Sequence, residues 1–62
     1  MELNISKKNL KILDIDSFDI NIIVLKCNEN KITSLPSEIG KLTNLEELLC
    51  YNNQIKLFIF LF

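Results

Sequence analysis

The two cysteines are the first residues in this chain that could carry out chemistry. Cys27 and Cys50 could form a disulfide or supply two ligands of a metal site. A zinc site needs at least three protein ligands, and the chain has no histidine to complete one. Free cysteine is also among the most buried residue types, where it packs as a small hydrophobe. We therefore expect both thiols to be buried, reduced and unreactive.

Acidic side chains are the other candidates. Asp14, Asp16 and Asp19 could bind a cation if they converged, although a solvated loop is the simpler interpretation. Glu46 and Glu47 are neighbours, so on a strand their side chains point to opposite faces and do not form an acid/base pair. The chain has no glycine-rich phosphate loop and no nucleophile beside a base. We predict that it is not an enzyme and uses no cofactor or metal.

The size and charge of the chain narrow its class further. Its 62 residues suffice for one small domain, and a hydrophobic content of 48% excludes disorder by composition. The net charge is −1, and all seven basic residues are lysines. Without arginine, bidentate recognition of phosphate or guanine is unavailable. This composition predicts no binding to nucleic acid and no polybasic membrane patch.

Neither end of the sequence looks like a targeting or membrane segment. Residues 1–13 alternate charged and apolar side chains and lack the apolar run of a secretory signal. The one continuous apolar run, Leu57–Phe62, is far shorter than the roughly 20 residues that cross a bilayer. We expect no membrane span and a cytoplasmic location.

The elements around these residues are set by a repeat. Leu25, Cys27, Asn30 and Ile32 recur 23 residues later as Leu48, Cys50, Asn53 and Ile55. The shared pattern is L-x-C-x-x-N-x-I. A fixed period of 20–50 residues is typical of repeats that bury their apolar faces against one another.

This pattern resembles the leucine-rich repeat family, in its cytosolic type with repeats of 22–23 residues. The segment Leu35–Leu45 also looks like that type, whose outer segment reads L-P-x-x-I-G-x-L-x-x-L. The resemblance implies an α/β fold: a short solenoid with a small parallel sheet and 3₁₀ or helical turns on its convex side. A plain amphipathic helix over Leu42–Leu49 would explain the leucines there, but not the recurring asparagines.

The repeat predicts each element. Strands are expected at 24–27 and 47–50, with one turn of helix or 3₁₀-helix near 37–42. Pro36 suits the start of that turn, and Gly40 is expected to end it. Asn30 and Asn53 should stack as a ladder that bonds buried backbone groups where the chain leaves each strand.

The whole chain is predicted to be one partial domain, 1–62. Residues 1–21 form a degenerate first coil with a strand at 3–5, in which Lys8 takes the position of the ladder asparagine. Residues 22–44 form a full repeat and residues 45–62 an incomplete one. In the last part, Phe58 and Phe62 occupy inward positions of the pattern.

In this family, binding uses the outward side chains of the concave sheet face. We expect four cross-strand rows there: Glu2, Val24 and Glu47; Asn4, Lys26 and Leu49; Ser6, Asn28 and Tyr51; and Lys7, Glu29 and Asn52. An exposed leucine beside an exposed tyrosine, as expected for Leu49 and Tyr51, is typical of a contact hot spot. Alternatively, Leu49 covers the open end of the repeats. The predicted protein-binding residues are Val24, Lys26, Asn28, Glu47, Leu49 and Tyr51.

The resemblance implies a non-enzymatic module that binds a protein partner. The alternative is a truncated fragment of a longer leucine-rich repeat protein without independent function. A third hypothesis is a structural role, with the phenylalanine-rich end docking a second copy or another repeat protein. In that case the chain would self-associate through Leu57–Phe62, which has the composition of an aggregation-prone strand.

Overall fold

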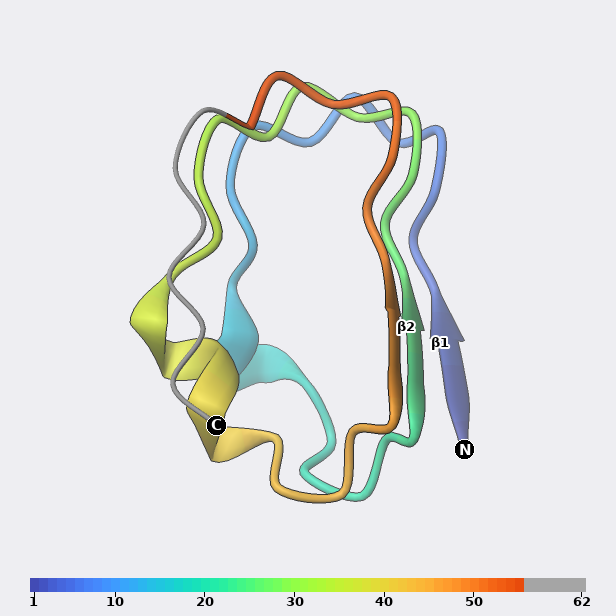
Figure 1. The fold of residues 1–62 in the computed structure, drawn as a ribbon, viewed down its shortest axis with the longest axis vertical. Helices are drawn as coiled ribbons and strands as arrows, with labels where there is room; N and C mark the ends of the chain where they lie inside the picture. The colour runs from blue at the N-terminus through green and yellow to red at the C-terminus, as the bar shows by residue number, and fades with distance from the viewer. Residues whose placement is uncertain (56–62) are drawn as a thin grey trace.

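The chain folds into three short parallel strands joined by two return segments. The structure, a computed structural model, describes residues 1–55 of the 62. Its elements are β1 (Glu2–Asn4), η1 (Ile15–Ser17), β2 (Val24–Lys26), η2 (Ser37–Lys41) and β3 (Glu47–Leu49). The sheet has the order β1-β2-β3, and the two 3₁₀-helices η1 and η2 lie on the opposite side of the molecule (Figure 1). We call a strand with its return segment a pass, so β1, β2 and β3 begin the first, second and third passes.

The register of the sheet follows the sequence repeat. Leu3 pairs with Leu25, which pairs with Leu48, and both strand pairs are parallel. The predicted rows Glu2–Val24–Glu47 and Asn4–Lys26–Leu49 are confirmed by the same pairing. Each strand is three residues long, and β1 begins one residue earlier than predicted. The inward and outward faces are therefore those that the alternation of side chains requires.

The hydrophobic core is centred on the second pass. Leu25, Cys27 and Ile32 are fully buried, because the first and third passes cover them from both sides. Their counterparts in the outer passes, such as Leu3 and Leu48, are only half-buried. The other buried apolar residues are Leu13, Ile15, Ile22, Leu35, Ile39 and Leu42.

The return segments contain 3₁₀-helices rather than α-helices. η2 follows Pro36 and buries Ile39, as predicted from the spacing of its apolar residues. Gly40 lies inside this helix and has no positive φ, so the prediction that it ends the turn is wrong. The helix ends at Lys41, and the next N–H, that of Leu42, still donates to the Ile39 carbonyl.

The first pass also forms a 3₁₀-helix, although its loop lacks the proline and glycine of the second. The Ser17 hydroxyl donates to the Asp14 carbonyl over 2.7 Å, and Ile15 supplies the buried side chain. The Lys41 ammonium meets the Asp16 carboxylate at 3.1 Å, so η1 and η2 stack one above the other. The degenerate sequence thus keeps the shape of the repeat with different side chains.

The asparagine ladder is present at the turns after β2 and β3. The Asn30 amide group donates to the carbonyls of Ile5, Cys27 and Asn28, and its oxygen accepts the N–H groups of Lys8 and Leu10. One pass later, Asn53 donates to the carbonyls of Cys27, Cys50 and Tyr51 and accepts the Ile32 N–H. Each asparagine therefore bonds its own turn and the turn of the preceding pass.

Two of the predictions concern residues that lie after Ile55. The inward positions of Phe58 and Phe62, and self-association through Leu57–Phe62, fall on residues that the structure does not describe. Within residues 1–55, no helix is long and apolar enough to cross a membrane.

Candidate functional site

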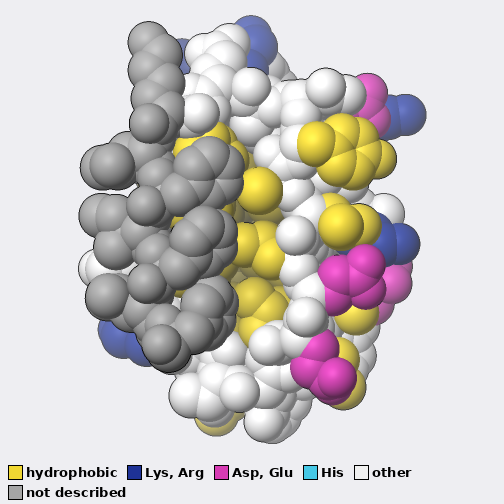
Figure 2. Space-filling model, in the orientation of Figure 1, with side chains coloured by type: hydrophobic (Ala, Val, Ile, Leu, Met, Phe, Trp, Pro, Cys, Tyr) yellow, Lys and Arg dark blue, Asp and Glu magenta, His cyan; other side chains and the backbone are white. Residues whose placement is uncertain are grey.

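The outward side chains of the three strands, together with Tyr51, form what we call the outer sheet face. Glu47 is exposed, whereas Val24, Lys26 and Leu49 are half-buried by their neighbours. In Figure 2, hydrophobic, acidic and basic side chains lie close together along the sheet side of the molecule. This face is open because both return segments lie on the opposite side of the sheet (Figure 1).

Tyr51 is the most exposed aromatic side chain of the described residues, with 60% of its surface accessible. Its backbone is held firmly: the N–H donates to the Asn28 side chain, and the carbonyl accepts bonds from the Glu29 N–H and the Asn53 amide. An exposed aromatic ring on a fixed backbone loses little conformational entropy when it is covered by a partner, so its position favours binding.

Asn28 does not belong to the exposed surface, and this corrects the prediction that its side chain faces solvent. Only 6% of it is accessible. Its side-chain oxygen accepts the Tyr51 N–H at 3.1 Å, and its own N–H donates to the Ser6 hydroxyl at 3.2 Å. Because β2 ends at Lys26, the alternation of inward and outward side chains no longer applies two residues later. Asn28 therefore links the turns of three passes and supports the site.

The charged residues of this face are partly paired. The Lys26 ammonium lies 3.3 Å from a Glu2 carboxylate oxygen, and Lys7 and Glu29 approach to 3.8 Å near the turn. Ion pairs at such accessible positions contribute about 0–1 kcal/mol to stability. Glu47 stands in the same row as Glu2, and no ion pair holds it within the described residues.

The two cysteines differ in their surroundings. Cys27 is fully buried, and its thiol donates to the Leu49 carbonyl over 3.4 Å. Burial raises the pKa of Cys27 from 9.0 to about 11, with a further contribution from Cys50. Cys50 is only half-buried, which corrects the expectation that both thiols are buried, and burial raises its pKa as well. Both thiols are free and predominantly protonated at neutral pH.

The acidic residues do not converge. Asp16 pairs with Lys41, and the Asp19 carboxylate accepts the Asn21 N–H at 2.8 Å. No group of three metal-ligating side chains exists within residues 1–55. The arrangement of Asp14, Asp16 and Asp19 is therefore that of a solvated loop.

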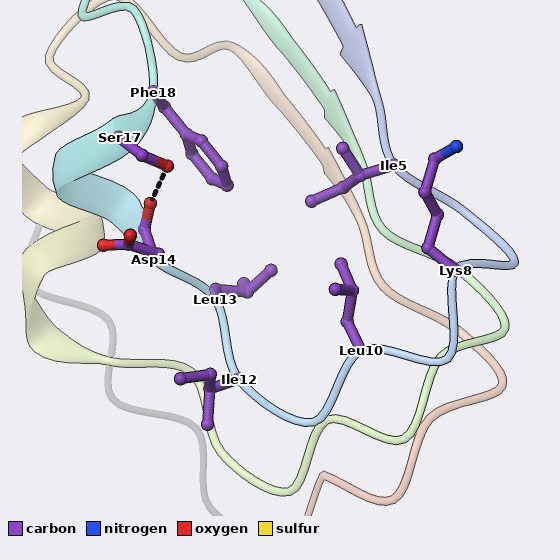
Figure 3. Close-up of a pocket in the computed structure, with 8 residues that line it drawn as sticks. All are labelled: Ile5, Lys8, Leu10, Ile12, Leu13, Asp14, Ser17 and Phe18. Carbon is purple, nitrogen blue, oxygen red and sulfur yellow. Dashed lines mark hydrogen bonds between the residues drawn. The ribbon is translucent and has the colours of Figure 1, made fainter.

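A cavity that the sequence did not predict is lined by residues of the first pass. Its volume is about 340 Å³, and Ile5, Leu10, Leu13 and Phe18 point toward its centre (Figure 3). Ile12, Lys8, Asp14 and Ser17 complete its lining. The signal was present in the sequence, because Ile5, Leu10 and Leu13 take the inward positions of the repeat in the first pass.

The second and third passes match a known protein family. A family model described as leucine-rich repeats in two copies matches residues 20–61, which include β2, η2 and β3. The chain belongs to the leucine-rich repeat family. No curated protein and no solved structure shows significant similarity to it.

The match begins after the first pass. β1 and η1 lie before residue 20, yet β1 pairs in register with β2 and carries inward apolar side chains as a repeat would. Leucine-rich repeats commonly mediate interactions between proteins and are typically not enzymes. A parallel sheet with one open face, as in this chain, is a surface on which such interactions can occur.

Proposed function

We propose that this leucine-rich repeat chain is a non-enzymatic protein-binding module that uses the concave, outer face of its sheet. The observation that carries the proposal is the exposed ring of Tyr51, which stands on a hydrogen-bonded backbone two residues after the half-buried Leu49. Tyrosine is enriched among residues that dominate binding energy. The contact residues proposed are Val24, Lys26, Glu47, Leu49 and Tyr51, with Asn28 holding the Tyr51 backbone in place.

The chemistry of the face suggests the kind of partner. Leu49 and Tyr51 offer an apolar contact, and Glu47 in β3 offers a carboxylate that forms no ion pair within residues 1–55. A segment with an aromatic or aliphatic side chain next to lysine or arginine would match both. The sheet has three strands of three residues, so the interface would be smaller than the roughly 1,600 Å² of a stable complex. The expected partner is a short peptide segment bound weakly.

A peptide selection tests this proposal without knowledge of the partner. Peptides displayed on phage would be selected on the full chain and then measured individually by fluorescence anisotropy. Tyr51→Ala should weaken binding of the selected peptides by about thirtyfold or more, since truncating a binding hot spot costs at least about 2 kcal/mol. Glu47→Gln should weaken only peptides with a basic residue, and more so at low salt.

The matched control is Ile20→Ala, which truncates a side chain of similar exposure outside the outer sheet face. Ile20 is 64% exposed against 60% for Tyr51. Its removal should leave peptide affinity unchanged. If the selected peptides bind the Tyr51 and Ile20 variants equally well, the outer sheet face is not the binding site.

The alternative is that the chain is a fragment of a longer leucine-rich repeat protein without a function of its own. The two matched copies and the short length favour it. Under either proposal the layout would be a partial solenoid, with a degenerate coil at 1–21, a full repeat at 22–44 and an incomplete repeat at 45–62, and its location would be cytoplasmic. Reading the genomic DNA on both sides of the coding sequence separates the two: further repeats in another frame would support the fragment.

A further inference from the structure

Positive charge is concentrated at the turns that follow β1 and β2. We call residues 7–11 and 28–31 the lysine turns, because they hold four of the six lysines within residues 1–55: Lys7, Lys8, Lys11 and Lys31. Glu29 is the one acidic residue among them. The side chains of the lysine turns therefore carry a net charge of +3, in a chain whose net charge is −1.

The two lysine turns lie side by side because their backbones are hydrogen-bonded. The Lys7 N–H donates to the Asn28 carbonyl at 3.1 Å, and the Lys31 N–H donates to the Leu10 carbonyl at 2.7 Å. The Asn30 side-chain oxygen accepts two further N–H groups of the first turn. All four lysines are exposed, so a fixed pair of turns presents their ammonium groups to solvent.

This surface lies on the side of the stacked passes and not on either end of the stack. Figure 1 looks along the stack, and the turns after the strands are at the top of the view. Lys31 belongs to the second pass, which has another pass on each side of it, and is exposed nevertheless. Its exposure therefore does not depend on which pass is the first or the last.

Most of the positive charge on the lysine turns is not neutralised by the described part of the chain. The other two lysines of residues 1–55, Lys26 and Lys41, lie 3.3 Å and 3.1 Å from a carboxylate oxygen. In the lysine turns only Lys7 approaches a carboxylate, that of Glu29, and the distance is 3.8 Å. The remaining three lysines form no ion pair within residues 1–55.

The acidic residues lie mainly in other parts of the molecule. Outside the lysine turns, residues 1–55 contain seven acidic residues and two lysines, a net charge of −5. Glu47 begins β3, and Asp16 and Glu38 belong to η1 and η2, all of which lie lower in Figure 1. The vertical axis of that view is the longest, at 25 Å. Since the Debye length is about 8 Å at physiological ionic strength, charges far along this axis have little effect on the lysine turns.

We propose that the lysine turns bind a short acidic segment of a partner protein. A run of aspartate or glutamate side chains complements several ammonium groups held on one fixed backbone, and lysine pairs with carboxylates as a point charge. A long polyanion such as a nucleic acid would also meet the net charge of −5 on the rest of the chain, whereas a short segment contacts the turns alone. This surface is separate from the outer sheet face, and the proposal does not depend on binding there.

Fluorescence anisotropy with a fluorescein-labelled octaglutamate peptide tests the proposal on the full chain. An ionic strength of about 0.1 M, where the Debye length is about 10 Å, restricts the attraction to nearby charges. The wild type should bind the peptide saturably. The double variant Lys11→Gln with Lys31→Gln should raise the dissociation constant by about fivefold or more, because two ammonium groups without ion pairs are lost.

The double variant Lys26→Gln with Lys41→Gln is the matched control. It lowers the net charge by the same amount outside the lysine turns and should change the dissociation constant less than about twofold. Circular dichroism should show that both variants fold. Equal weakening in the two double variants would overturn the proposal, as would the absence of saturable binding at millimolar peptide. A single-stranded oligothymidylate of equal charge that binds as tightly as octaglutamate would also overturn it, since the surface would then attract any polyanion.

Discussion

Asn30 and Asn28 show that two asparagines two residues apart can both be structural. Asn30 accepts two backbone N–H groups and donates to three carbonyls, all around one buried turn. Asn28 accepts one N–H, that of Tyr51, and thereby connects the second turn to the third. The positive φ angles of Lys7, Glu29 and Asn52, at equivalent positions of the three turns, are conformations that cost energy. The asparagine bonds hold the chain in this shape.

The number of bonds predicts a graded effect of substitution. Asn30→Ala should lower the free energy of unfolding by about 2–3 kcal/mol, since two partly buried N–H groups lose their acceptor and three carbonyls lose a donor. Asn28→Ala should cost about 1 kcal/mol, because one N–H at a partly exposed position loses its acceptor. Asn44→Ala, at an exposed position, is the control and should change stability by a few tenths. Urea unfolding followed by circular dichroism measures all three. Equal midpoints for the Asn30 and Asn44 variants would contradict the ladder.

The two thiols should react in a fixed order. At pH 7.5 a maleimide should label the half-buried Cys50 first and the buried Cys27 much more slowly, and both should be slower than in the urea-unfolded chain. Burial raises both pKa values, so the reactive thiolate is scarce at neutral pH. Labelling of Cys27 should accelerate as the pH rises toward its pKa of about 11.

Mass spectrometry of the labelled peptides, with Cys27→Ala and Cys50→Ala as single-thiol controls, measures the rates. Faster labelling of Cys27 than of Cys50 would mean that the side chains assigned to the inward face of the sheet point outward.

At the scale of the elements, η1 and η2 show how different sequences give the same turn. η2 uses Pro36 to set the chain direction and Ile39 to enter the core. η1 uses the Ser17 hydroxyl on the Asp14 carbonyl and buries Ile15 instead. Both turns therefore need an apolar side chain that points inward at this position and backbone groups whose hydrogen bonds are made. Several residue types can meet this requirement.

Gly40 provides a test at this scale. Because Gly40 is exposed and has no positive φ, an alanine should adopt the same backbone conformation. Gly40→Ala should therefore stabilise the chain by about 0.4–1 kcal/mol, by reducing the entropy of the unfolded state. Chemical unfolding of this variant beside Lys41→Ala, which removes only the exposed ion pair with Asp16, measures the difference. A loss of stability in Gly40→Ala would show that the turn needs a glycine for close packing.

The sequence predicted those features that depend on the period alone. The strand rows, the ladder of Asn30 and Asn53 and the 3₁₀ turn after Pro36 all follow from the 22–23-residue repeat and the alternation of side chains. The burial of Asn28 could not be predicted, because it lies beyond the end of β2, where alternation gives no information. The cavity could not be predicted, because it depends on how far the side chains of the first pass fill the space between them, and a repeat pattern gives only which of them point inward.

At the scale of the whole molecule, stability depends on the second pass. A chain of this length has a free energy of unfolding of about 3–9 kcal/mol by the usual value per residue. Its most deeply buried side chains, Ile22, Leu25, Cys27, Ile32 and Ile39, lie in the second pass or next to it. The first pass adds Leu13 and Ile15 to the same core, and the described part of the third pass adds half-buried side chains such as Leu48. The passes should therefore unfold together, since neither outer pass has a buried core of its own.

Leu25 and Leu3 test this distribution because they are register partners in adjacent strands with the same side chain. Leu25 is fully buried and Leu3 half-buried. Leu25→Ala should cost about 2–5 kcal/mol, a large part of the total, and should remove most of the cooperative urea transition at 25 °C. Leu3→Ala should cost about 1 kcal/mol and leave a single transition at lower urea, because its site is already open to water on one side. Comparable losses for the two variants would show that Leu3 is covered in solution as fully as Leu25.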